Sequence, residues 1–167
     1  MKQIGQWVLY AAFFVSLGVL SVQPRLRLMA DDEAIVSLSF SHAAKRVGEC
    51  RQLSQEELMA LPPNMRKPEE CPRERFPIGI VLLMDGQILY EASLPPTGLW
   101  ADGKSTAYQR IRVSAGEHDF VISMNDSGTA GAFNYERSST INLLPGENLV
   151  VYFDAGNQQF KYHQVSR

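Results

Sequence analysis

The chain has 167 residues, a formal net charge of −2 and 20% charged residues. This balance excludes the strongly basic surface that is typical of nucleic-acid-binding domains, so we expect no nucleic acid among its partners. About 145 residues follow an apolar N-terminal segment, and this length fits one domain with a sizeable core.

The N-terminal segment is apolar and carries no charge from Trp7 to Val22. As a helix, residues 4–22 would extend about 28 Å, close to the ~30 Å hydrocarbon thickness of a bilayer. The alternative is a cleaved signal peptide, but Val19-Leu20-Ser21 is a poor cleavage site and the apolar run exceeds the usual length. We therefore expect an uncleaved transmembrane anchor over residues 1–24, embedded in the lipid bilayer through residues 4–22.

The charges beside this segment give little information on its orientation, because Lys2 precedes it while Arg25 and Arg27 follow it. A short N-terminal tail before a single apolar segment usually stays in the cytoplasm. We therefore expect a linker at 25–33 and an extracytoplasmic domain at 34–167. For a bacterial source, this predicts a single-pass protein of the inner (cytoplasmic) membrane with its C-terminal domain in the periplasm.

The chain has two cysteines, Cys50 and Cys71, which bound an insertion in the domain. In an exported domain they most simply form a disulfide, which would stabilise the closed loop by about 3 kcal/mol. One alternative is a pair of reduced thiols in a cytoplasmic domain. Another is a metal or thiol carrier in which His42 joins both cysteines, although their spacing matches no zinc signature.

Between the cysteines lies one short predicted helix. Ser54 and Glu57 form a capping-box pattern, and Pro62-Pro63 ends the helix. A second helical turn is expected over residues 42–47. Because helices this short are not stable alone, we expect both to pack against a larger element.

That larger element is predicted from alternating apolar residues and turn signals in the rest of the chain. Asp85-Gly86 is a two-residue hairpin signal between two apolar stretches. The expected strands cover residues 34–40, 78–84, 87–91, 107–113, 118–124, 133–135, 138–144, 148–154 and 159–163. This pattern indicates a mainly β fold, an antiparallel β-sandwich with short helices, preceded by one transmembrane helix.

Two turns of the chain resemble those of a known class of domain. Val113-Ser114-Ala115-Gly116-Glu117-His118 and Leu144-Pro145-Gly146-Glu147 each precede an alternating strand. They are similar to turns of PEGA-like and transthyretin-like β-sandwich modules, over about residues 78–163. The stretch from Leu94 to Thr106 and the Cys-bounded segment depart from that pattern. Such modules are usually non-catalytic binding or spacer domains, so the resemblance implies a sandwich without catalytic residues.

Motifs for catalysis are absent from the sequence. None of GxSxG, HExxH, a P-loop or GxGxxG is present, and no nucleophile motif accompanies the histidines. We expect His118 to be a buried or rim residue of a strand and His163 to be exposed. Asp126 is expected in a turn or an outward strand position. The sequence therefore predicts a protein that is not an enzyme and holds no cofactor or metal.

Several large or charged residues lie in stretches whose folding does not obviously require them. A Pro- and Gly-rich stretch from 94 to 103 carries a Trp that either covers the core edge or contacts a partner. Clustered arginines beside prolines suit docking against acidic protein loops or lipid phosphates, or form a solvated face. The predicted partner-binding residues are Trp7, Arg66, Arg73, Arg75 and Trp100.

These observations favour a non-catalytic, membrane-anchored accessory or assembly subunit of an integral inner-membrane protein complex. A respiratory or electron-transfer complex is the leading candidate. The main alternative is a periplasmic ligand-binding module for carbohydrate or cell-wall material, with Trp100, Tyr108 and Tyr135 as an exposed stacking platform. The metal or thiol carrier with Cys50, Cys71 and His42 is the other.

Overall fold

The computed structural model describes residues 2–22, 30–129 and 131–166. The chain divides into two compact units, Met1–Ala30 and Asp31–Arg167, which we describe separately. Most of the linker expected at 25–33 lies outside the described residues.

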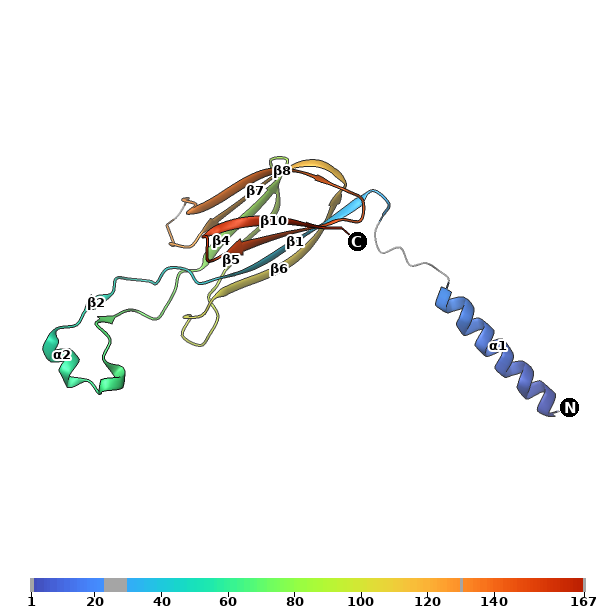
Figure 1. The fold of residues 1–167 in the computed structure, drawn as a ribbon, viewed down its shortest axis with the longest axis horizontal. Helices are drawn as coiled ribbons and strands as arrows, with labels where there is room; N and C mark the ends of the chain where they lie inside the picture. Colours follow the sequence, from blue (N-terminus) through green and yellow to red (C-terminus); the bar gives the residue numbers. More distant parts are fainter. Residues whose placement is uncertain (1, 23–29, 130, 167) are drawn as a thin grey trace. The chain divides into compact units, whose positions relative to one another are not determined.

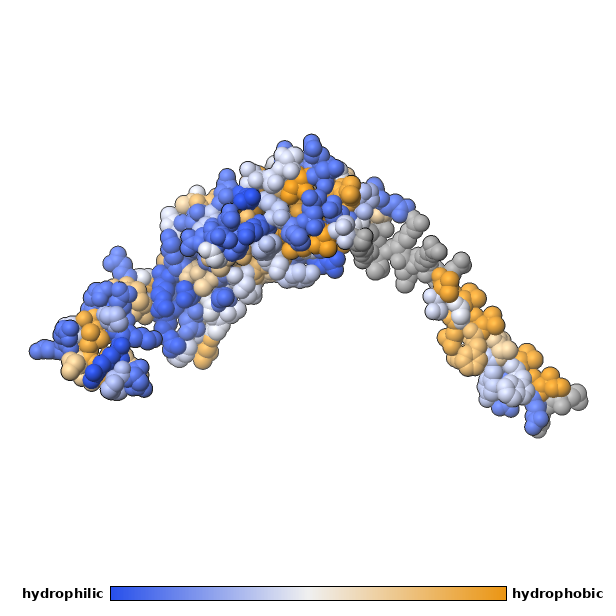
Figure 2. Space-filling model, viewed as in Figure 1, coloured by the Kyte–Doolittle hydropathy of each residue, from blue (hydrophilic) through white to orange (hydrophobic). Residues whose placement is uncertain are grey.

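The first unit contains a helix, α1 (Lys2–Val22). Figure 2 shows apolar side chains along most of this helix. In the described part of the chain, the span Gln3–Val22 is the one helix long and apolar enough to cross a membrane, judged by length and composition. A signal sequence near an N-terminus passes the same test. The apolar helix expected from the sequence is therefore present.

In the described residues, the second unit is a sandwich of two four-stranded sheets (Figure 1). The first sheet has the order β10-β9-β1-β6 and the second has the order β5-β4-β7-β8. Their strands are β1 (Glu33–His42), β4 (Ile78–Met84), β5 (Gln87–Leu94), β6 (Ser105–Ser114), β7 (Gly116–Asn125), β8 (Tyr135–Leu143), β9 (Asn148–Asp154) and β10 (Gln159–Val165). The mainly β sandwich predicted from the sequence is confirmed.

The core lies between the two sheets and uses alternate positions of most strands. On β7, for example, Phe120, Ile122 and Met124 are fully buried, because every second side chain of a strand faces the opposite sheet. The other fully or nearly fully buried large side chains are Val36, Leu38, Ile78, Ile80, Leu82, Leu143, Leu149, Val151 and Phe160.

One strand pair differs from a purely antiparallel arrangement. β1 pairs with β6 antiparallel and with β9 parallel, with Ile35 opposite Asn148. Ser37 on β1 donates a hydrogen bond to Asn148 Oδ1 at 2.7 Å, which adds a side-chain link beside the parallel ladder.

The hairpin predicted at Asp85-Gly86 is confirmed. Asp85 and Gly86 have φ angles of 51° and 76° and join β4 to β5. Two successive positive φ values are the signature of a type I′ turn, whose twist matches that of the flanking strands. β4 has the predicted bounds, and β5 extends three residues beyond the predicted end at Glu91.

Two strands predicted at 133–135 and 138–144 are in fact one, β8 (Tyr135–Leu143). β8 is an edge strand of its sheet, and its buried side chains, Ile141 and Leu143, lie near its end, while most of the residues before them are exposed. Exposed positions accept polar residues such as Glu136 and Arg137, which hide the alternation on which a sequence prediction depends.

Between β1 and β4 the chain leaves the sandwich as an extended segment, residues 43–77, which we call the arm (Figure 1). It contains β2 (Arg51–Gln52), α2 (Gln55–Ala60), the 3-10 turn η1 (Pro63–Met65) and β3 (Glu69–Glu70). β2 and β3 form a short antiparallel ladder. The capping box predicted at Ser54 and Glu57 is confirmed, because both of its hydrogen bonds are present.

Two expectations about the arm are wrong. Residues 42–47 form no helical turn, because His42 ends β1 and Arg46 forms an isolated β-bridge with Arg75 across the base of the arm. The helix α2 does not pack on the sandwich, since none of its six residues is buried and Met59 is 66% exposed. Its own capping box and the ion pair of Glu57 with Arg51 stabilise α2 in place of burial.

Candidate functional site

The outer part of the arm, residues 50–71, is called its tip below. A disulfide and one arginine cross-link this tip. The structure joins Cys50 to Cys71, as the sequence predicts. Beside this bond, Arg51 donates to Glu57 Oε1 at 2.8 Å and to Glu70 Oε2 at 3.0 Å, so one guanidinium connects α2 to β3. The Arg51 hydrogen bond, supported by the backbone N–H of Ser54, lowers the pKa of Glu57 to about 2. The tip is therefore cross-linked within itself.

Arg66, a predicted partner-binding residue, contributes to this internal order. Its Nε donates to the carbonyl of Leu61 at 2.9 Å and its Nη2 lies 3.4 Å from the carbonyl of Met59. Carbonyls at the end of a short helix lack partners within the helix, and a cation satisfies them well. Arg66 thus closes the C-terminal end of α2.

Arg75 connects the base of the arm to the loop between β5 and β6. Its Nη1 donates to the carbonyl of Ala44 at 2.6 Å, and its Nε donates to the carbonyl of Asp102 at 2.9 Å. Its backbone N–H donates to the carbonyl of Ala101 at 2.9 Å. This structural role does not follow from the sequence, because each carbonyl belongs to a segment distant along the chain.

The loop between β5 and β6, residues 95–104, carries Trp100 and is called the Trp100 loop below. Thr97 Oγ1 donates to the carbonyl of Lys104 at 2.9 Å, and the N–H of Gly103 donates to the carbonyl of Thr97 at 2.8 Å. The loop therefore folds on its own backbone. Leu99 is 92% and Trp100 is 65% exposed, so the ring faces solvent and does not cover the core edge.

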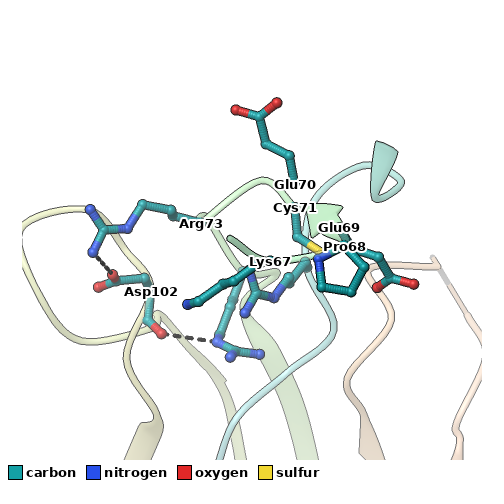
Figure 3. A pocket seen from close by; sticks show the side chains of 9 residues that line it. Lys67, Pro68, Glu69, Glu70, Cys71, Arg73 and Asp102 are labelled. Atoms are coloured by element: carbon teal, nitrogen blue, oxygen red, sulfur yellow. Dashed lines mark hydrogen bonds and ion pairs between the residues drawn. The ribbon is translucent and has the colours of Figure 1, made fainter. Parts of the chain in front are cut away.

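The arm and the Trp100 loop enclose a cavity of about 690 Å³ (Figure 3). Four cations line it, together with Asp102 and residues 68–71, which include Glu69 and Glu70; the cations are Arg46, Lys67, Arg73 and Arg75. Arg73 reaches across the opening, with its Nη2 3.4 Å from Asp102 Oδ2. Of the five predicted partner-binding residues, the structure brings Arg73 and Arg75 into this cavity. Arg46 and Lys67 are not among the predicted partner-binding residues, because nothing in the sequence marks them as facing the loop.

A Ser–His–Asp arrangement lies elsewhere, at the ends of two hairpins. His118 Nδ1 is 2.7 Å from Asp85 Oδ2, and its Nε2 is 3.3 Å from Ser114 Oγ and 3.1 Å from the Ser114 carbonyl. A carbonyl oxygen only accepts hydrogen bonds, so this contact requires Nε2 to donate. A donating nitrogen cannot take the hydroxyl proton of Ser114. The arrangement fixes the ring, which lies at the sandwich rim as expected.

Asp126 and His42 form a pair inside the sandwich. Asp126 lies in the loop after β7, in line with the expected turn position, but the residue is buried, and its Oδ2 lies 3.2 Å from His42 Nε2. The ring of His42 packs on Phe153, with centroids 4.8 Å apart. A buried carboxylate requires such a partner, and the sequence could not show that His42 provides it.

The carrier alternative required reduced thiols, whereas both sulfurs lie in the disulfide in the described structure. Ligand-type atoms of Cys50, Glu69 and Cys71 lie within 4.8 Å of one another, but a disulfide sulfur is not a thiolate ligand.

The carbohydrate alternative required three aromatic rings on one exposed face. Tyr108 and Trp100 are exposed, but Tyr135 packs against the core, with its ring centroid 5.2 Å from that of Phe153. Burial raises the pKa of Tyr135, with a smaller contribution from the charge of Asp126. The expected platform of three rings is therefore not present.

The remaining predicted residue, Trp7, lies on α1, where its ring meets that of Tyr10 edge to face at 6.4 Å. His163 is exposed on β10, as expected. No protein-family model and no curated protein matches the chain. The resemblance to PEGA-like and transthyretin-like modules therefore stays a prediction about two turns.

Proposed function

We propose that the protein is a non-catalytic, membrane-anchored accessory or assembly subunit of an inner-membrane protein complex. In this proposal α1 anchors the chain in the bilayer, and the arm and the Trp100 loop contact the partner. The sandwich serves as the rigid support for both contact segments. A respiratory or electron-transfer complex remains the leading candidate for the partner.

The observation that carries the proposal is an ordered arm whose outer part, residues 50–71, adds no buried residue to the core. Ordering a residue costs about 1–2 kcal/mol in backbone entropy, which burial usually offsets. In the arm, α2 and η1 bury none of their residues, and a disulfide, a capping box and ion pairs hold the shape instead. A cross-linked, exposed segment on a rigid scaffold is typical of binding sites.

The disulfide and the apolar helix also support a compartment for the domain. A disulfide persists in oxidising compartments, and among bacterial ones the periplasm is the one facing the inner membrane. Together with the apolar α1, the bond supports a domain on the periplasmic side of that membrane.

Site-specific cross-linking in intact cells tests the proposal. A photo-crosslinking amino acid replaces Met59 on the arm in one variant and the partly exposed Tyr152 on β9 in a matched control. We expect position 59 to give a discrete adduct with an integral membrane protein, identified by mass spectrometry, and position 152 to give none. Equal adducts at both positions, or none at position 59, would contradict the proposal.

A second variant distinguishes the contribution of the arm to partner binding from that of α1. Replacing residues 53–68 by a Gly/Ser segment of equal length keeps the disulfide, the sandwich and α1. We expect this variant to stay in the membrane and lose the partner during purification in detergent. If it retains the partner, α1 alone makes the contact, and the assigned role of the arm is wrong.

A further inference from the structure

We infer that the cavity between the arm and the Trp100 loop is a docking site for an acidic segment of a partner protein, whose carboxylates bind Lys67, Arg73 and Arg46. This inference rests on the proposed function and names the chemistry of its contact.

The cations of the cavity retain donors that the fold does not use. Among the described residues, Lys67 has no hydrogen-bond or ion-pair partner, so all three of its donors are available. Arg46 makes one side-chain hydrogen bond, from Nη1 to the carbonyl of Pro72 at 3.0 Å. Figure 3 shows Lys67 extending toward the space between the arm and Asp102.

Arg73 is held loosely. Its 3.4 Å distance to Asp102 exceeds the roughly 2.7–2.9 Å of a tight charge-assisted hydrogen bond, and its side chain is 71% exposed. A guanidinium offers five donors in a planar fork, and this contact uses one. Arg73 can therefore bind a second carboxylate in bidentate fashion.

The acidic residues at the rim are already engaged. Glu69 accepts a hydrogen bond from Gln52 Nε2 at 2.6 Å, and Glu70 accepts from Arg51 at 3.0 Å. In Figure 3 the carboxylate of Glu70 points away from the cavity. The described lining has four cations and three carboxylates, and the ion pair of Glu70 with Arg51, which is not a lining residue, leaves an excess of positive charge in the cavity.

The charge of the arm and the residues around the cavity favour a polypeptide as the ligand, over a lipid surface or a phosphate. The arm carries seven Lys or Arg and six Asp or Glu residues, a near balance without long-range attraction to an anionic bilayer. Asp102 repels a doubly charged phosphate more than a single carboxylate. The exposed Leu99 and Trp100 offer apolar contact in the same loop as Asp102, and charged and apolar groups together are typical of protein interfaces.

Binding of hexaglutamate to the full chain in neutral detergent tests this inference. The chain has two tryptophans, so Trp7→Phe leaves Trp100, in the same loop as the lining residue Asp102, as the sole tryptophan reporter. We expect saturable binding that Lys67→Glu and Arg73→Glu each weaken about tenfold or more. Lys67→Gln, which removes no contact within the fold, should weaken binding in the same direction.

Arg110→Glu is the matched control, because Arg110 is exposed on β6 and undergoes the same change of charge. Equal weakening by Arg110→Glu, or none by Lys67→Glu, would overturn the inference. Stronger competition by inorganic phosphate or by phosphatidylglycerol vesicles would assign the site to phosphates. A cross-link at position 59 that persists in Lys67→Glu would leave the proposed function intact while excluding the cavity as its contact.

Discussion

His118 Nδ1 lies 2.7 Å from Asp85 Oδ2, and this contact fastens the start of strand β7 to the turn between β4 and β5. The second oxygen of the same carboxylate accepts the backbone N–H of Asp119 at 2.9 Å. One aspartate side chain therefore joins a hairpin turn to the neighbouring strand β7.

These contacts predict an acid-sensitive stability. The N–H of Asp119, and then the His118 ring, lower the pKa of Asp85 below its usual value. The contribution of a carboxylate with a depressed folded pKa is present above its unfolded pKa of about 3.9 and is lost as the pH falls through the folded pKa. We expect Asp85→Asn, which tolerates the positive φ of this position, to lower the melting temperature at neutral pH and to flatten its decline below pH ~4.

Melting curves of the two proteins between pH 7 and pH 2 measure this effect. Thr140→Val, which removes a neighbouring hydrogen bond to Asp119, serves as a control that leaves Asp85 intact. Curves for Asp85→Asn and the unchanged protein that stay parallel over the whole range would contradict the role of Asp85.

Local patterns predicted much of the sandwich. The bounds of β4 and β9 match the structure, because each strand combines an apolar run with clear turn residues at its ends. The capping box at Ser54 also depends on residues three apart in sequence, so it is visible without a structure.

Contacts between distant segments account for what the sequence did not predict. The parallel pairing of β1 with β9 depends on which strands meet in space, which alternation does not encode. The burial of Asp126 depends on His42 from β1, and the structural role of Arg75 depends on carbonyls of the Trp100 loop. The cavity was only half predicted, because Arg46 and Lys67 face it solely through the fold of the arm.

The disulfide should stabilise the arm more than the sandwich. Closing a loop of this length contributes about 3 kcal/mol of stability. The tip of the arm makes no core contacts, so this stabilisation should not extend to the sandwich. We expect Cys50→Ser to hasten tryptic cleavage after Arg66 while the melting temperature of the sandwich changes little. Thiol labelling of the denatured, unreduced protein checks the premise, and complete labelling of both cysteines would refute the disulfide.

Tyr162 links the two sheets, and its hydroxyl should lose its proton only at unusually high pH. From β10 its hydroxyl donates to the carbonyl of Arg137 on β8 at 3.0 Å, and burial raises its pKa to about 12. Its unfolded pKa is about 10, so the stability it gives is complete below pH ~10 and is lost as the pH rises through 12. We expect Tyr162→Phe to cost about 1 kcal/mol at neutral pH.

Alkaline titration of phenolate absorbance tests this expectation. The substitution should remove the highest of the ionisation steps, and the remaining tyrosines should titrate as before. If the highest step persists in Tyr162→Phe, another tyrosine is the buried one.

The apolar helix α1 should keep the full chain in the membrane. No charge interrupts Trp7 to Val22, so we expect the mature protein to start at Met1 or Lys2 and to stay in the pellet after carbonate washing. N-terminal sequencing and fractionation measure both properties. A mature N-terminus at or beyond Val22, with the protein in the soluble fraction, would identify the segment as a cleaved signal peptide.

Substitutions of Arg75 and Trp100 should distinguish a residue needed for folding from a residue needed for binding. Arg75→Ala leaves the buried carbonyl of Ala44 without its donor and detaches the arm from the Trp100 loop, so we expect a loss of about 2 kcal/mol in the free energy of unfolding. Trp100→Ala removes an exposed ring that makes no core contact. We expect this variant to melt like the unchanged protein and to bind the partner with a loss of about 1–3 kcal/mol.

Denaturant unfolding and partner co-purification, both on the full chain in detergent, distinguish the two residues. Arg75→Lys keeps the charge but not the fork that reaches two carbonyls, so it should destabilise the fold nearly as much as Arg75→Ala. A Trp100→Ala variant that unfolds early would make the ring structural. One that melts normally and still retains the partner would place the contact on the arm alone, since the arm keeps its shape without Trp100.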